Sequence, residues 1–142
     1  MTIAAILGRK GDRLFSIESG MLLREAVAIL SENRIGALPV TRGGEVAGIL
    51  SERDIIYCLQ REGAAVLDMA VDKAMTAPAI TVTPDVPILA ALSQMSAKRI
   101  RHLPVVEGGR LVGIVSIGDL VAHRIARIEE EAEAMRAYIQ AG

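Results

Sequence analysis

The chain has 142 residues, of which 51% are hydrophobic, but only Phe15, Tyr57 and Tyr138 are aromatic. Its 16 basic and 17 acidic residues give a net charge of −1, which argues against a nucleic-acid partner held mainly by phosphate contacts. The scarcity of aromatic side chains also removes the usual stacking platform for single-stranded nucleic acid, so we expect one compact domain with an aliphatic core.

Three further classes of protein are disfavoured by the sequence. Cys58 is the only cysteine, so an internal disulfide or a zinc cluster of thiolates cannot form, and its apolar neighbours indicate a buried thiol. No apolar run approaches the roughly 18 residues of a membrane span. The charges near the N-terminus follow the apolar part, the reverse of a secretory signal. We therefore expect a cytoplasmic protein with no membrane partner.

An internal repeat organises the chain. Residues 35–54 read IGALPVTRGGEVAGILSERD, and residues 100–119, which lie 65 positions later, read IRHLPVVEGGRLVGIVSIGD. The repeat extends back without a gap to residue 15 over residue 80, and 13 of these 40 positions are identical. A unit of 65 residues is short for an independent domain. We therefore expect two pseudo-symmetric units that share a core and form equivalent clefts.

Each unit has the same predicted order of elements. A short strand at 15–17 or 79–82 precedes an amphipathic helix, which begins near Ser19 in one unit and near Thr83 in the other, with Pro87 in the first turn. A strand follows at 37–40 or 102–106, where Pro39 and Pro104 indicate a strand start or an edge. Paired glycines then predict a tight hairpin turn. A return strand at 46–50 or 111–115 follows the turn, and a second helix follows that strand.

The predicted fold class is therefore mixed α/β (α+β), with the order β-α-β-β-α twice, the units packed sheet to sheet, and a long C-terminal helix. We assign unit 1 to residues 1–62, a connecting segment to 63–76, unit 2 to 77–124 and a helical extension to 125–142.

The last helix carries an apolar seam with alternating spacings of four and three residues, as in a coiled coil. Two interpretations remain open: the helix packs on its own domain, or it pairs with a second chain. The seam consists of Val121, Ile125, Ile128, Ala132, Met135 and Ile139.

The strongest local signal is Ser-x-x-Asp at the start of each second helix, Ser51 with Asp54 and Ser116 with Asp119. A serine N-cap with an acid three residues later is typical of a capping box. The same geometry suits a ligand, because free amides bind phosphate and a carboxylate accepts hydrogen bonds from ribose hydroxyls. Gly118, unfavourable within a helix, fits a close approach by such a ligand.

A basic cluster at 98–102 is the second signal. Lys98 and Arg99 fit a solvated helix end, whereas Arg101 and His102 alternate on a strand, so at least one of them should face a cleft or a neighbour. The first unit has Gly36 and Ala37 at the matching positions. His123 is predicted to be solvated. We find no nucleophile with an orienting base and no metal-ligand cluster, which indicates that the protein is not an enzyme.

With these residues in view, the chain resembles a tandem CBS-domain protein, a Bateman module standing alone. The resemblance covers about residues 2–124 and depends on the duplicated Leu-Pro-Val strands in register with Gly-x-x-Ser-x-x-Asp. It implies two symmetry-related clefts that bind adenine nucleotides, and family members usually dimerise through their helices.

The resemblance also implies roles for individual residues. Asp54 and Asp119 would hold ribose hydroxyls, with Ser51 and Ser116 beside the ribose or phosphate. The first strands would contact adenine, while Arg101, His102 and Thr76 would reach phosphates, and Arg53 could compensate for the missing basic pair in unit 1. The implied nucleotide-binding set is Asp119, Ser116, Gly118, Asp54, Ser51, Arg53, Arg101, His102, Thr76, Ile80, Thr81, Val82, Pro104, Ser16, Ile17 and Pro39.

The sequence thus predicts a non-enzymatic sensor that forms a homodimer and signals to a separate effector protein. Its leading candidate ligand is AMP, followed by ATP, ADP or NAD. The alternatives are a ligand-free interaction module, in which the Ser-x-x-Asp boxes only cap helices, and a nucleic-acid binder, which the charge disfavours.

Overall fold

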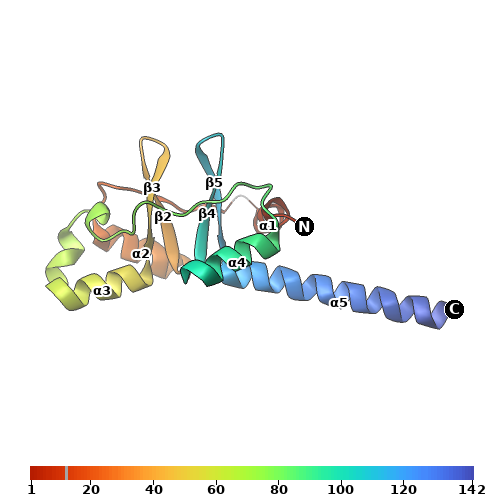
Figure 1. Cartoon of the computed structure of the whole chain (residues 1–142). Coiled ribbons are helices and arrows are strands. Elements are labelled where there is room, and N and C mark those ends of the chain that lie inside the picture. The colour runs from red at the N-terminus through yellow and green to blue at the C-terminus, as the bar shows by residue number, and fades with distance from the viewer. Residues whose placement is uncertain (12) are drawn as a thin grey trace.

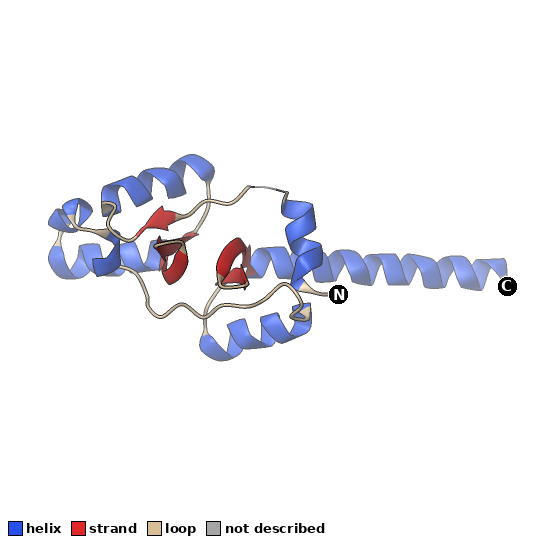
Figure 2. Ribbon diagram, turned by 90° about the horizontal axis from the view of Figure 1, so that it is seen from above, coloured by secondary structure: helices blue, strands red, loops and turns tan. Residues whose placement is uncertain are grey.

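The computed structural model describes residues 1–11 and 13–142, and two similar halves are evident in it (Figure 1). The hairpins β2–β3 and β4–β5 lie side by side at the centre, with helices around them (Figure 2). The elements are α1 Ile3–Lys10, β1 Ile17–Glu18, α2 Leu23–Asn33, β2 Ala37–Arg42, β3 Glu45–Ser51, α3 Glu52–Glu62, the short 3₁₀ helices η1 Ala64–Asp68 and η2 Val71–Lys73, α4 Ile88–Lys98, β4 His102–Glu107, β5 Arg110–Ser116 and α5 Ile117–Ala141.

The two hairpins form as the paired glycines predict. Gly43 and Gly44 have φ of 60° and 85°, and Gly108 and Gly109 have φ of 58° and 78°, which are left-handed values that a two-residue primed turn requires. Each hairpin also has a register shift at the same place, after Val40 in the first and after Val105 in the second. The repeat in sequence is therefore a repeat in backbone geometry.

The first strand of each unit is shorter than the sequence predicts. In the first half only Ile17 and Glu18 pair with β2, in parallel, and in the second half a single bridge joins Val82 to Val105. Pro84, two residues after Val82, has no N–H with which to extend this pairing. The Val82 N–H donates to the Pro104 carbonyl, so the backbone of Pro104 faces Val82 rather than β5. The N–H that proline lacks is therefore not needed for the β4–β5 ladder.

The first helix of each unit begins later than predicted. α2 begins at Leu23 rather than near Ser19, because the Ser19 N–H donates to the Thr41 carbonyl and continues the pairing of β1 with β2. α4 begins at Ile88, and Pro87 is its N-cap rather than part of its first turn. In both cases backbone pairing with a neighbouring segment, which local sequence does not reveal, holds the preceding residues out of the helix.

Each half has its own apolar core, and each core is completed by chain from outside the repeat. Ile3 and Ile6 of α1 are buried in the core of the second half, although α1 precedes the first half. Val66 of η1 and Val71 of η2 are buried in the core of the first half, although they precede the second. The domain boundaries inferred from sequence group residues 1–62 together, whereas α1 packs on the second half.

His123 is buried rather than solvated, in contrast to the sequence prediction. Its exposed fraction is 5%, and neither ring nitrogen has a hydrogen-bond partner among the described residues. It lies one turn after the fully buried Leu120 on α5, so the face that carries it is turned toward the body of the domain. Cys58 is buried, as predicted.

Two glycines at equivalent positions differ in what surrounds them. A Cβ on Gly48 would lie 2.7 Å from the Thr76 carbonyl oxygen, which is backbone, whereas one on Gly113 would lie 2.5 Å from Cδ2 of Leu7, a flexible side-chain end. We expect Gly48→Ala to lower the free energy of unfolding by about 1–3 kcal/mol. Gly113→Ala should cost well under half as much, because Leu7 can rotate away.

Urea unfolding of both variants checks this difference. Gly113→Ala is the matched control, since it introduces the same methyl group at the same strand position of the other half. Equal losses of stability would contradict the proposed difference between backbone and side-chain contact.

Candidate functional site

Two cavities lie between the halves and are related by the same pseudo-symmetry as the repeat. The Asp54 cleft has a volume of about 530 Å³, and the Asp119 cleft has a volume of about 400 Å³. Gly36 and His102 line both. The Asp54 cleft is also lined by Ile49, Ser51, Glu52, Arg53, Asp54, Ile56, Tyr57, Thr76, Pro78, Ala79, Ile80, Arg99, Ile100 and Arg101, and the Asp119 cleft by Lys10, Arg13, Phe15, Asn33, Arg34, Ile35, Ala37, Ile114, Ser116 and Asp119.

A capping box positions the carboxylate in each cleft. Ser51 ends β3, and its N–H donates to Oδ2 of Asp54 at 2.9 Å, while the Asp54 N–H donates back to the Ser51 hydroxyl at 3.2 Å. Ser116 and Asp119 repeat this arrangement at 2.9 and 3.1 Å. The capping interpretation of Ser-x-x-Asp is therefore confirmed. It does not compete with ligand binding, because the cap fixes each carboxylate at a cleft and leaves acceptor capacity on Oδ1.

Thr76 is the partner of the first carboxylate. Its hydroxyl donates to Oδ1 of Asp54 at 3.0 Å, and its backbone forms an antiparallel bridge with Ile49. The segment that follows η2 therefore lies along β3, and it carries Thr76 to the mouth of the Asp54 cleft. Among the described residues, Asp54 makes no ion pair.

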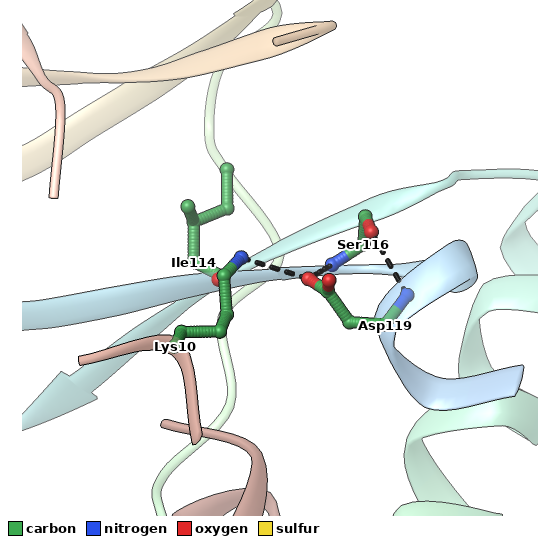
Figure 3. Close-up of polar contacts among 4 residues, drawn as sticks. All are labelled: Lys10, Ile114, Ser116 and Asp119. Atoms are coloured by element: carbon green, nitrogen blue, oxygen red, sulfur yellow. Dashed lines mark hydrogen bonds and ion pairs between the residues drawn. The ribbon is translucent and has the colours of Figure 1, made fainter. Parts of the chain in front are cut away.

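Lys10 is the partner of the second carboxylate (Figure 3). Its ammonium donates to Oδ2 of Asp119 at 2.8 Å and to the Ile114 carbonyl at 2.9 Å. Burial alone would raise the pKa of Asp119, but hydrogen bonds from Lys10 and Ser116 and the charge of Lys10 bring it below its ordinary value. Asp119 is thus a firmly ionised and already paired carboxylate.

Arg34 and Arg99 are cleft residues that sequence reasoning did not assign. They end α2 and α4 with φ of 52° and 55°, a left-handed conformation that costs a non-glycine residue about 1 kcal/mol or more. Both repeats carry arginine where glycine would be unstrained, and each arginine lines a cleft. Arg34 and Arg99 occupy matching positions of the two repeats, whereas the other basic residues at 98–102 have no basic counterpart in the first unit. The repeated arginine is therefore a signal in the sequence that points to the clefts.

A model of the CBS domain family matches residues 11–61 and again residues 70–125. The chain belongs to the CBS-domain family. The repeat units are its two CBS domains, and CBS domains serve generally as regulatory, ligand-binding modules. The fold class and the resemblance inferred from the sequence are both confirmed.

The chain is similar to proteins of several organisms. It is 37% identical over 123 residues to the mitochondrial CBS domain-containing protein CBSX3 of Arabidopsis thaliana, covering 83% of this chain but only 60% of that protein. A crystal structure of a CBS-domain protein from Agrobacterium tumefaciens superposes with a TM-score of 0.82 at 36% identity, covering 87% of this chain and 99% of that one.

Two further solved structures bear on ligands and assembly. The CBS domain pair of protein MJ0100, solved in complex with 5′-methylthioadenosine and S-adenosyl-L-methionine, matches with a TM-score of 0.79 at 26% identity, over 89% of this chain and 98% of that one. A hexameric CBS-CP12 protein from bloom-forming cyanobacteria matches with a TM-score of 0.77 at 26% identity, over 99% of this chain and 86% of that one.

The structure brings together about half of the nucleotide-binding residues predicted for this CBS pair. Ser51, Arg53, Asp54, Thr76, Ile80, Arg101 and His102 line the Asp54 cleft, and Ser116 and Asp119 line the other. Ile17, Val82, Pro39 and Pro104 are buried in the two halves, while Ser16, Thr81 and Gly118 lie outside the lining of either cleft. The cleft residues missed by the sequence analysis include Lys10 and Arg13, which lie outside the repeat.

Two other kinds of site are absent from the described part of the chain. Residues 1–11 and 13–142 hold no cluster of three or more metal-ligating side chains. None of the helices in these residues is both long and apolar enough to cross a membrane.

His102 sits where the two clefts of the CBS pair meet. Burial lowers its pKa below the usual value, and the charges of Lys10 and Arg101 act in the same direction, whereas Asp119 and Glu52 oppose the shift. The folded protein therefore binds fewer protons at this site than the unfolded chain does. It follows that stability falls as the pH drops below about 6.5, the ordinary pKa of histidine.

We expect His102→Gln to reduce this loss of stability between pH 7.5 and 5.5, because glutamine is neutral throughout that range. Urea unfolding of both proteins at pH 5.5, 6.5 and 7.5 measures it. Asp119 acts in a separate window, since its lowered pKa stabilises the fold above about pH 3.8 and that stability is lost only in stronger acid. An identical pH dependence of the two proteins between 5.5 and 7.5 would rule out His102 as the titrating group.

Proposed function

We propose that this CBS pair is a non-enzymatic regulatory module that binds an adenine nucleotide in the Asp54 cleft and conveys its occupancy to a separate effector protein. The observation that carries the proposal is the Asp54 carboxylate, which is held at the start of α3 and contacted by the Thr76 hydroxyl. A carboxylate in this position can accept hydrogen bonds from the two hydroxyls of a ribose.

The surroundings of Asp54 suit the other parts of a nucleotide. Pro78, Ile80 and Tyr57 supply apolar surface for an adenine ring. Arg53, Arg99 and Arg101 supply cations for phosphate, and arginine can pair with phosphate through two parallel hydrogen bonds. The ligands named for the MJ0100 pair both contain adenosine, which supports the adenosine part of the proposal.

AMP is the first candidate, followed by ATP, ADP and NAD. The choice depends on how many phosphates the three arginines can reach, and a short phosphate tail fits a cavity of about 530 Å³ beside an adenosine. A cytoplasmic location, where such nucleotides are abundant, stays a prediction. The alternative is a ligand-free interaction module, because the capping boxes account for Ser51 and Asp54 without a nucleotide.

Thermal unfolding with AMP, ADP, ATP and NAD distinguishes these functions. A ligand present at 100 times its dissociation constant should add about 2.7 kcal/mol to the free energy of unfolding. Asp54→Ala should abolish most of the ligand-induced shift, since it removes a charged acceptor worth about 1.5–3 kcal/mol.

Glu25→Ala is the matched control. Glu25 accepts a hydrogen bond from the Leu22 N–H at 2.8 Å at the start of α2, so it is also a first-turn carboxylate, but it lines neither cleft. Both variants should lose about 0.5–1 kcal/mol of stability without nucleotide. If none of the four nucleotides shifts the melting temperature of the unaltered protein, the ligand-free function is favoured.

We further propose that α5 pairs with a second copy of the chain. Val121 and Ile125 of the seam are 42% and 52% exposed, while His123 on the opposite face is buried against the body, so the seam is not covered by its own domain. Beyond Ile128 every residue of α5 is exposed, and the helix projects away from both halves (Figure 1). The hexameric neighbour that matches 99% of this chain supports assembly in general.

Ile128→Glu combined with Met135→Glu should convert the dimer to a monomer, because unpaired carboxylates would be buried in the contact. Light scattering measures the mass directly. Ala134→Glu with Ala137→Glu places the same two charges on the opposite face of α5 and should leave the dimer intact. A protein that is already monomeric at high concentration, or an unchanged mass for the seam variant, would refute this role for α5.

A further inference from the structure

The two clefts differ in the segments that precede the two repeat units. In the Asp54 cleft, the Ile49 carbonyl accepts a hydrogen bond from the Thr76 N–H at 2.8 Å, and the carboxylate accepts one from the Thr76 hydroxyl. In the Asp119 cleft, the matching Ile114 carbonyl and the matching carboxylate both accept from the Lys10 ammonium. A single cation thus makes the two contacts that a threonine makes in the other half.

This replacement changes what each carboxylate can offer to a ligand. A threonine hydroxyl is neutral and can rotate, so Asp54 can exchange this hydrogen bond for one from a ribose hydroxyl. The Lys10 ammonium compensates the charge of Asp119 and occupies the cleft beside it, since Lys10 is itself a lining residue. A ribose that enters the Asp119 cleft must therefore compete with an internal cation.

Lys10 is held in place by the packing of α1 rather than lying on a loose tail. Ile3 and Ile6 are buried in the second core, and the Ile3 N–H donates to the Val86 carbonyl at 2.9 Å. The lysine side chain is 32% exposed, and Asp119 is 27% exposed. Water still reaches both side chains and weakens their attraction, so a ligand can displace the lysine.

We propose that Lys10 is an internal competitor for the Asp119 cleft, so that an adenosine ligand fills the Asp54 cleft first and the Asp119 cleft only after displacing this lysine. The inference rests on the proposed adenosine binding and extends it, because it makes the clefts unequal. A ligand in the Asp119 cleft would then displace the Lys10 side chain, which belongs to the last turn of α1.

Binding is best measured in an Asp54→Ala background, where the remaining signal comes from the Asp119 cleft. Isothermal titration with adenosine and with AMP should show that adding Lys10→Met tightens adenosine binding about two- to fivefold, the range expected for loss of a weak ion pair. Methionine keeps the apolar stem of lysine. Arg9→Met, a neighbouring and exposed cation on the same helix, is the matched control and should leave the affinity unchanged.

The probes separate the outcomes. If Lys10→Met weakens the binding of AMP but not of adenosine, Lys10 is a phosphate ligand and the competitor role is overturned. Unchanged adenosine affinity overturns it as well, while the proposed function stands if the unaltered protein binds and Asp54→Ala weakens that binding. Absence of binding to the unaltered protein would overturn both. Circular dichroism of each variant, with Lys10→Gln as a second substitution, guards against an effect of misfolding.

Discussion

The exchange of packing segments between the halves is the constraint on which the clefts depend. Neither core is complete with its own repeat, because α1 fills the second core and η1 and η2 fill the first. Each of these crossing segments, α1 and the pair η1 and η2, ends beside a carboxylate. The chain after η2 places Thr76 next to Asp54, and α1 ends at Lys10 next to Asp119. Apolar burial therefore positions the polar groups of both clefts, since shifting either segment would expose buried aliphatic side chains.

Capping and recognition use the same side chains without conflict. Ser51 and Ser116 satisfy helix amides that would otherwise have no partner, and the aspartates return a bond to the serine N–H. Two bonds of this kind fix each carboxylate in one rotamer, so little conformational entropy remains to be lost when a ligand binds. A local folding signal thus also supplies a pre-organised acceptor.

The two carboxylates nevertheless have different surroundings, and the reason lies outside the repeat. Thr76 and Lys10 precede the second and the first repeat unit, where the two sequences are no longer similar. The halves are alike in backbone, from their hairpin turns to their register shifts, but the segments that complete them are not. The difference in partner between the two carboxylates of this CBS pair therefore arises from the crossing segments.

The sequence by itself determined the repeat, the hairpins and the capping boxes, because each depends on residues close together in the chain, such as Gly43 with Gly44 or Ser51 with Asp54. It also indicated the clefts through the duplicated Ser-x-x-Asp and the basic residues near His102. Only the tertiary structure decided that Lys10 meets Asp119, that His123 is buried and that α1 belongs to the second core. These contacts join residues up to 109 positions apart, and their partners are fixed by how the two cores close on each other, which no local pattern encodes.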